Sequence, residues 1–126
     1  MNGFSDFTVA DGRGFFRPTR TITLDDTIAL IAGAITHARE LGLQQILVDT
    51  RNLTGHGPPD TFQRYYLMNR WLEAAGGQVQ LALIVRPEMM DRGRFALQVA
   101  ENRGFVANAF LNEEQALDWL ASRADN

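Results

Sequence analysis

Apolar residues along the chain recur with two different periods, one helical and one typical of strands. Four apolar residues spaced by three or four positions predict one face of a helix: Leu24, Ile28, Ile31 and Ile35. Thr23 is expected to cap this helix, with Asp26 at the third helical position, and Gly42 is expected to end it. A second helix is predicted from Asp60, its expected cap, to the glycines at 76–77.

Short apolar runs bounded by polar residues predict buried strands between the helices. Residues 46–48 form one such run, and residues 79–85 form the clearest one. Pro87 suits the first position of a third helix, which is expected to run to Gly104, and residues 105–111 are expected to form a last strand. Asn112, with Gln115 three residues later, is expected to cap a final helix that faces the core with Ala116, Leu117 and Leu120.

The N-terminal segment has the loose alternation of short strands in a meander, with a turn at residues 11–14. The remaining order is α-β-α-β-α-β-α, and strands separated by helices require parallel crossovers. The expected fold is therefore an α/β domain with a mixed β-sheet, antiparallel at its N-terminal edge and parallel beyond it. The chain of 126 residues suits a single domain spanning residues 1–126.

Composition narrows the chemistry that this fold can support. The net charge of −3 argues against nucleic acid as a partner, because nucleic acid requires a basic surface. The apolar runs are too short for membrane insertion. The first residues contain neither a basic segment nor an apolar one, so no secretory signal is predicted and the expected location is cytoplasmic.

Residue types that several reaction classes need are missing. There is no cysteine, all twelve basic residues are arginine, and serine occurs only at positions 5 and 122. Thiol nucleophiles, Schiff-base lysines and a serine triad in the body of the domain are thereby excluded. The two histidines, His37 and His56, are too few for a zinc site. We expect no catalytic residue, no metal and no cofactor, and a protein that is not an enzyme.

Three stretches of the chain, residues 21–26, 46–55 and 95–120, match a known pattern. Together they resemble the bacterial SpoIIAA-like family, which has the STAS fold and is distantly likened to CRAL-TRIO lipid-transfer domains. The resemblance covers nearly the whole chain. It implies a STAS-like domain, and most members of this family have no assigned activity.

Anti-sigma-factor antagonists with the STAS fold carry a phosphorylated Ser or Thr just before the second helix. Counting from Asp49, which ends the matching strand, that place falls at about Pro58, where there is no hydroxyl group. Thr54 and Thr61 flank this place without matching it. No phosphorylation site is therefore expected.

Five residues are candidates for ligand binding: Asp49, Arg51, Asn52, His56 and Arg86. Asp49, Arg51 and Asn52 follow one predicted parallel strand and Arg86 ends the next, at the sheet edge where ligands bind in open α/β folds. If Arg51 and Arg86 converge, they can hold a carboxylate or a phosphate. The alternative is a solvated loop in which Asp49 accepts from backbone amides and Arg51 pairs with it.

The second helix carries more large apolar side chains than one buried face uses. They fall on three stripes: Tyr65, Met68 and Leu72; Leu67 and Trp71; Phe62 and Tyr66. Because exposed apolar patches usually mark an interface, Leu67 and Trp71, or else Tyr65 and Met68, are expected to contact a partner protein or a second subunit in a homodimer. The alternative is a helix buried on two sides by neighbouring helices.

Two functional classes follow, with an enzyme of unknown class as a third. The first is a non-catalytic binding or regulatory module of SpoIIAA-like type, acting through protein–protein contact at the second helix. The second is a carrier of a small apolar or amphipathic ligand, with aromatic walls and an arginine at its mouth. A closed apolar cavity favours the carrier, whereas an exposed apolar patch favours the module.

Overall fold

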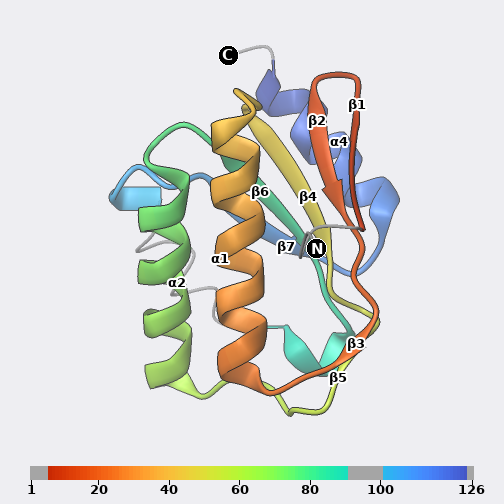
Figure 1. Cartoon of the computed structure of the whole chain (residues 1–126), viewed down its shortest axis with the longest axis vertical. Coiled ribbons are helices and arrows are strands. Elements are labelled where there is room, and N and C mark those ends of the chain that lie inside the picture. The colour runs from red at the N-terminus through yellow and green to blue at the C-terminus, as the bar shows by residue number, and fades with distance from the viewer. Residues whose placement is uncertain (1–5, 91–100, 125–126) are drawn as a thin grey trace.

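The computed structural model describes residues 6–90 and 101–124 of the chain. Its central sheet has five strands in the order β1, β2, β4, β6 and β7 (Figure 1). Their bounds are Phe7–Ala10, Arg13–Phe16, Gln45–Asp49, Gln80–Ile84 and Ala107–Phe110. Only the β1–β2 pair is antiparallel within this sheet. The chain is therefore an α/β protein with a mixed sheet and an antiparallel N-terminal edge, as the sequence predicts.

Helices cover both faces of this sheet. Helices α1 (Leu24–Glu40) and α2 (Thr61–Ala75) lie side by side on one face, and α4 (Glu113–Ala124) packs on the other (Figure 1). In β4, Ile46 and Val48 join the core under α1 and α2, whereas Leu47 joins the core under α4. This alternation follows from the period of two along a strand, so each central strand contributes to two separate cores.

The predicted helix boundaries agree with the hydrogen bonds at the helix ends. The Thr23 hydroxyl accepts from the Asp26 backbone N–H at 3.1 Å. At α2, Asp60 accepts from the Gln63 backbone N–H, and the Gln63 side chain accepts from the Asp60 backbone N–H, which completes a capping box. Asn112 caps α4 by accepting from the Gln115 backbone N–H at 2.9 Å. The caps read from the sequence are confirmed.

The region after β6 differs from the expected third helix at its start and agrees with it at its end, where residues 101–102 are helical and Gly104 has φ of 88°. Pro87 does begin a helix, but it is the three-residue 3-10 helix η1 (Pro87–Met89), and Met90 is extended with ψ of 130°. The rest of the expected helix includes residues 91–100, which lie outside the described residues. A proline at the first position permits a helical turn without requiring that the helix continue.

The N-terminal segment also departs from a simple meander. The turn comprises Asp11 and Gly12, both with positive φ, whereas Arg13 and Gly14 already belong to β2. The third short strand, β3 (Arg20–Thr21), leaves the sheet and pairs in parallel with β5 (Leu53–Thr54). This small second sheet ties the segment before α1 to the loop after β4. Among the described helices, none is long and apolar enough to cross a membrane.

Candidate functional site

A pocket of about 120 Å³ lies between α1, α2 and the sheet, at the carboxyl ends of the parallel strands. Its walls are mostly apolar, and it is partly open to solvent. Helix α1 contributes Leu24, Ile28 and Ile31, and α2 contributes Leu67, Met68 and Trp71. Strands β6 and β7 form the floor with Leu81, Leu83, Ala107 and Ala109. The pocket therefore occupies the edge of the sheet where α/β folds bind ligands.

The size of the floor residues explains why space remains under α2. The strand register places Ile46, Leu81 and Ala107 in one row across the sheet, and Val48, Leu83 and Ala109 in the next. In both rows the side chains change from branched residues on β4 and β6 to alanine on β7. Alanine is too short to reach the covering helix, so the pocket forms where the rows end in a methyl group.

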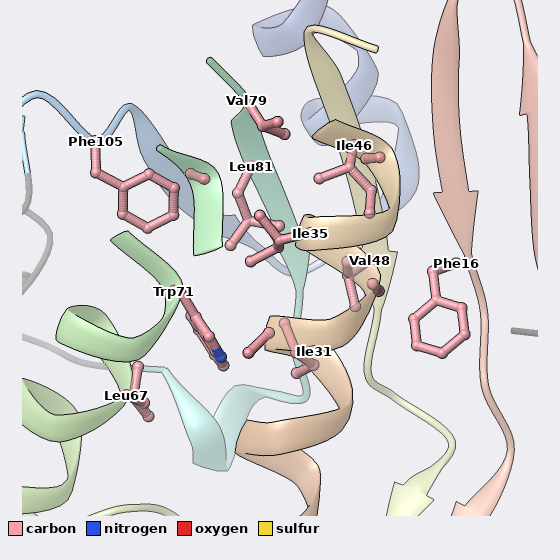
Figure 2. Packing of buried hydrophobic residues seen from close by; sticks show 14 of the residues in the cluster. Phe16, Ile31, Ile35, Ile46, Val48, Leu67, Trp71, Val79, Leu81 and Phe105 are labelled. Atoms are coloured by element: carbon pink, nitrogen blue, oxygen red, sulfur yellow. The ribbon is translucent and has the colours of Figure 1, made fainter. Parts of the chain in front are cut away.

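Trp71 fixes the wall between the two helices. Its side chain points from α2 toward α1, close to Ile31 (Figure 2), and its indole N–H donates to the Ile28 carbonyl oxygen at 3.1 Å. Only 3% of Trp71 is exposed. A buried indole that has both its apolar surface and its N–H satisfied adopts one position, so the aromatic wall of the pocket is preformed.

The loop after β5 brings His56 to the pocket mouth. The Ile22 backbone N–H donates to the Thr54 carbonyl oxygen at 2.7 Å, which holds this loop against the segment before α1. Gly55 has φ of 103°, and a Cβ there would lie 2.7 Å from the Ile22 carbonyl oxygen. Only glycine fits such a turn without strain. The sequence therefore places a glycine where the chain must turn back toward α1.

Two contacts orient the His56 ring. Its Nδ1 donates to the Gly57 carbonyl oxygen at 2.9 Å, since a carbonyl only accepts. Its Nε2 lies 3.2 Å from the Thr27 hydroxyl oxygen. That hydroxyl also lies 2.9 Å from the Thr23 carbonyl oxygen and carries a single proton, so it donates to one of the two at a time. His56 is thus a fixed polar group on the rim of an apolar pocket.

Arg86 is the polar group at the mouth with an unsatisfied hydrogen-bonding atom. Its Nη2 donates to the Leu53 carbonyl oxygen at 3.3 Å, and its Nη1 lies 3.6 Å from a Glu88 carboxylate oxygen. Its Nε is buried and has no hydrogen-bond partner among the described residues. An unsatisfied buried donor costs about 1–3 kcal/mol, so native structures rarely keep one without a reason.

The candidate residues after β4 do not line this pocket. The Asp49 carboxylate accepts from Arg51 Nε at 2.9 Å and Nη2 at 2.8 Å, and from the Arg51 backbone N–H at 3.1 Å. Asn52 is exposed, and its carbonyl oxygen accepts from the Arg20 backbone N–H. Arg51 and Arg86 therefore do not converge on one pocket. The alternative considered for this loop, Asp49 paired with Arg51, is the one observed.

Electrostatics explain why the pair at Asp49 is stable. Burial raises the pKa of Asp49, but the hydrogen bonds from Arg51 and the positive charges of Arg51 and Arg17 lower it by more. The pKa of Asp49 consequently lies below its ordinary value. The hydrogen bond to Asp49 raises the pKa of Arg51 further. The two residues stabilise each other's charged form, so they act as a structural ion pair.

The stripes on α2 are mostly covered by the chain itself. Leu67, Met68 and Trp71 are each less than one-tenth exposed, because α1 lies beside α2 and the sheet lies beneath both (Figure 2). The expectation that these side chains form an exposed stripe is wrong, and the helix is buried on two sides instead. Tyr65 is half-buried, whereas Phe62 is 80% exposed and Tyr66 is 44% exposed. These last two are the apolar surface that α2 leaves open.

Several pocket residues were not candidates from the sequence. Thr27, Leu53, Arg64 and Asn108 line the pocket beside His56 and Arg86. Arg64 is one turn into α2, where an arginine usually indicates only a solvated helix face. Leu53 sits in a polar loop, and its burial results from the β3–β5 pairing, which a local pattern does not reveal.

The fold and this site define a class: an α/β domain with an apolar pocket at the carboxyl edge of its parallel strands and basic groups at the mouth. No protein-family model, curated protein or solved structure matches the chain. Within residues 6–90 and 101–124, no cluster of three or more His, Asp or Glu side chains is placed to hold a metal ion.

Proposed function

We propose that this protein is a non-catalytic binding module that accepts a small apolar or amphipathic molecule in the pocket between α1, α2 and the sheet. The observation that carries the proposal is the pocket itself, with its volume of about 120 Å³ and its mostly apolar walls. Apolar protein cavities of about 150 Å³ bind benzene. The apolar part of the ligand therefore has roughly the size of one aromatic ring or a chain of about six carbons.

The preformed aromatic wall also supports binding rather than simple imperfect packing. Trp71 is tied to the Ile28 carbonyl oxygen and Leu67 is buried beside it, so neither side chain is free to collapse into the space. A pocket held open by its own hydrogen bonds costs little to reorganise when a ligand enters, and such preorganisation favours affinity.

Trp71 offers a direct test, because it lines the pocket and the chain has two tryptophans. In a Trp119→Phe background, emission comes from Trp71 alone. Titration with toluene or 1-hexanol is expected to change this emission saturably. Ala109→Leu fills the floor and should abolish the change, whereas Phe62→Ser, outside the pocket, should preserve it. A folded protein whose emission never saturates with either molecule contradicts the proposal.

Protein–protein contact at α2 is the second candidate, favoured by the exposure of Phe62 and Tyr66. These two residues are four apart and share one helix face. If they mediate a homodimer or another complex, sedimentation should show association that Phe62→Ser weakens and Leu111→Ser, an exposed apolar control outside α2, does not. Monomeric wild-type protein at high concentration would remove the homodimer from consideration.

Membership of the SpoIIAA-like family, with its STAS fold, is part of the proposal. The resemblance of residues 21–26 and 46–55 supports it, together with a mixed sheet whose parallel strands alternate with helices. We expect the protein to act in the cytoplasm without a cofactor. Recovery of the protein from the cytoplasmic fraction of its host, with no cofactor mass on native mass spectrometry, would support both expectations.

A further inference from the structure

We propose that the pocket selects a small carboxylic acid, with an apolar body about the size of a benzene ring and one carboxylate held at the mouth by Arg86 and Arg64. This inference rests on the proposed ligand-binding function and adds the chemical class of the ligand. It follows from the geometry of Arg86, from the balance of charge at the mouth and from the limited volume behind it.

The guanidinium of Arg86 has a donor available for such a ligand. Its Nη2 contact with the Leu53 carbonyl oxygen is 3.3 Å and its Nη1 contact with Glu88 is 3.6 Å, so both are longer than good hydrogen bonds. Its buried Nε lacks an acceptor among the described residues. A guanidinium presents Nε–H and one Nη–H as a fork that matches two carboxylate oxygens. A small turn of the side chain, at the expense of the long Leu53 contact, presents that fork to the pocket.

Arg64 supplies a second positive charge among the residues that line the pocket. It is half-buried on α2 and lines the same pocket, and its guanidinium makes no hydrogen bond or ion pair with the other described residues. No Asp or Glu is among the described residues that line the pocket. Among the described residues, Glu88 pairs with Arg86, and its side chain is 56% exposed.

This balance of charge favours a monoanion. Among the described residues at the mouth, two arginines and one glutamate leave one net positive charge. A carboxylate carries one negative charge and neutralises it. A phosphate dianion would leave a negative charge uncompensated next to apolar walls, which is costly because buried charges need partners. The volume of about 120 Å³ limits the apolar body to roughly one ring.

The test compares phenylacetate with phenylacetamide, which have the same shape and differ in charge. Affinity for each is measured by calorimetric titration of the full chain, and the Arg86 Nε–H resonance is followed in ¹H–¹⁵N spectra. We expect phenylacetate to bind at least about tenfold more tightly, as charge-assisted hydrogen bonds allow. We also expect it to shift the Nε–H resonance much further than phenylacetamide does.

Three variants test whether Arg86 causes the preference for the acid. Arg86→Met should remove the preference for the acid, because it removes the guanidinium that holds the carboxylate. Arg123→Met, which removes the same charge from α4 on the opposite face, should keep the preference. Arg86→Lys retains the charge without the planar fork and should keep part of the preference, so it serves if Arg86→Met does not fold.

The outcomes separate this inference from the proposed function. Equal affinity for the acid and the amide, or a preference that survives Arg86→Met, overturns the carboxylate assignment and leaves a pocket for neutral apolar molecules. A folded protein that binds neither molecule nor toluene overturns both. Tighter binding of benzylphosphonate than of phenylacetate overturns the argument from charge balance and assigns the mouth to a phosphoryl group instead.

Discussion

The two faces of the central sheet are covered by helices in different ways. Under α4, a small core of five fully buried residues is surrounded by four partly buried hydrophobic side chains. The five are Leu47, Ala82, Ile84, Ala116 and Leu120, and the four are Phe15, Phe110, Leu117 and Trp119. Under α1 and α2 the core is larger, yet Leu83 and Ala107 remain partly accessible on the floor of the pocket. Among the described helices, α4 lies across three strands on what we call the closed face, whereas α1 and α2 lie side by side and the pocket forms where the rows of the sheet end in alanines.

The buried polar groups of the two faces differ in the same way. On the α4 side, Gln45 accepts from Arg13 Nε at 2.7 Å and donates to the Gln80 side chain and to the Leu120 carbonyl oxygen. On the pocket side, the Nε of Arg86 has no partner among the described residues. A satisfied buried network helps to specify one structure, whereas an unsatisfied buried donor is rare and requires an explanation. The faces thus differ in their buried polar groups, and the proposed ligand site lies on the face with the unsatisfied donor.

The largest expected effect is on the pocket face, at Trp71. Trp71→Ala should reduce the free energy of unfolding by about 3–5 kcal/mol, because it removes a large buried side chain and leaves a cavity. Trp71→Glu places a charge in the same apolar space and should prevent folding rather than produce a folded monomer. Urea unfolding measures the first, and circular dichroism of the purified variant measures the second. A stably folded Trp71→Glu protein would show that α2 does not pack as described.

On the closed face, Leu120→Ala should cost about 2–5 kcal/mol by the same measurement. Leu120 is fully buried, and it does not line the pocket under α1 and α2. This substitution should leave toluene binding to the folded protein unchanged, whereas Trp71→Ala should alter it. If the two substitutions change toluene binding equally, the proposal that only the face under α1 and α2 binds the ligand is wrong.

Removal of the two buried polar groups should reduce the free energy of unfolding by different amounts. Gln45→Met leaves the Leu120 carbonyl oxygen and the Arg13 Nε unpaired and should cost about 1–3 kcal/mol. Arg86→Met removes a donor that is already unpaired together with two long contacts, so its cost should be clearly smaller. Urea unfolding curves of the two variants compare these losses of stability. A larger loss for Arg86→Met would mean that Arg86 is a structural group.

Removal of a helix cap on each face gives a smaller and more local effect. Asp60→Ala at α2 and Asn112→Ala at α4 should each cost about 1 kcal/mol. Asp60→Ala should also weaken toluene binding, since the first turns of α2 carry Arg64 and lead to Leu67. Asn112→Ala is the matched control, for which binding by the folded protein should not change. Identical binding by both variants would show that the pocket does not depend on the start of α2.

The smallest effect concerns acid stability on the closed side of β4. The pKa of Asp49 is lower in the folded chain than in the unfolded one, so ionised Asp49 stabilises the fold above the ordinary carboxyl pKa of about 3.9. That contribution is lost as the pH falls through the lower folded pKa. Because Arg51 is about 42% exposed, it should amount to less than about 1 kcal/mol.

Unfolding midpoints measured between pH 7 and pH 3 test this expectation. Asp49→Asn should flatten the acid limb of the curve, and Asp118→Asn, an exposed carboxyl on α4, is the control for loss of one carboxyl group. An acid limb that is unchanged in Asp49→Asn would mean that the ion pair with Arg51 does not couple folding to pH.

Much of the fold can be predicted from the sequence, because the patterns that indicate its helices and strands are local. The stripe from Ile28 to Ile35, the Asp60–Gln63 capping box and the apolar run in β6 each depend on residues close together in the chain. The alternation of helices and strands then dictates the parallel order. The hairpin turn was placed correctly at Asp11, although the strand resumes two residues earlier than expected.

The site could be predicted less well from the sequence, because its properties depend on contacts between residues far apart in the chain. His56 and Arg86 were identified from their positions after strands, but no local pattern indicates that Arg51 is already paired with Asp49. Trp71 gives the same helical signal whether it faces solvent or a neighbouring helix, and only the packing of α1 beside α2 decides between them. The pocket itself depends on Ala109 lying in register with Leu83, which the sequence does not state.

The pairing of β3 with β5 affects the local opening motions of the protein. The amide of Ile22 is bonded to Thr54, and Gly55 fits against Ile22 too closely for any larger residue. The rim that carries His56 is therefore attached to the entry of α1 and does not move as an independent loop. Such attached segments open as cooperative units in native-state hydrogen exchange, below the free energy of global unfolding. Access to the pocket then follows the protection factor of a single amide, that of Ile22, while the amides of β4 and β6 stay protected.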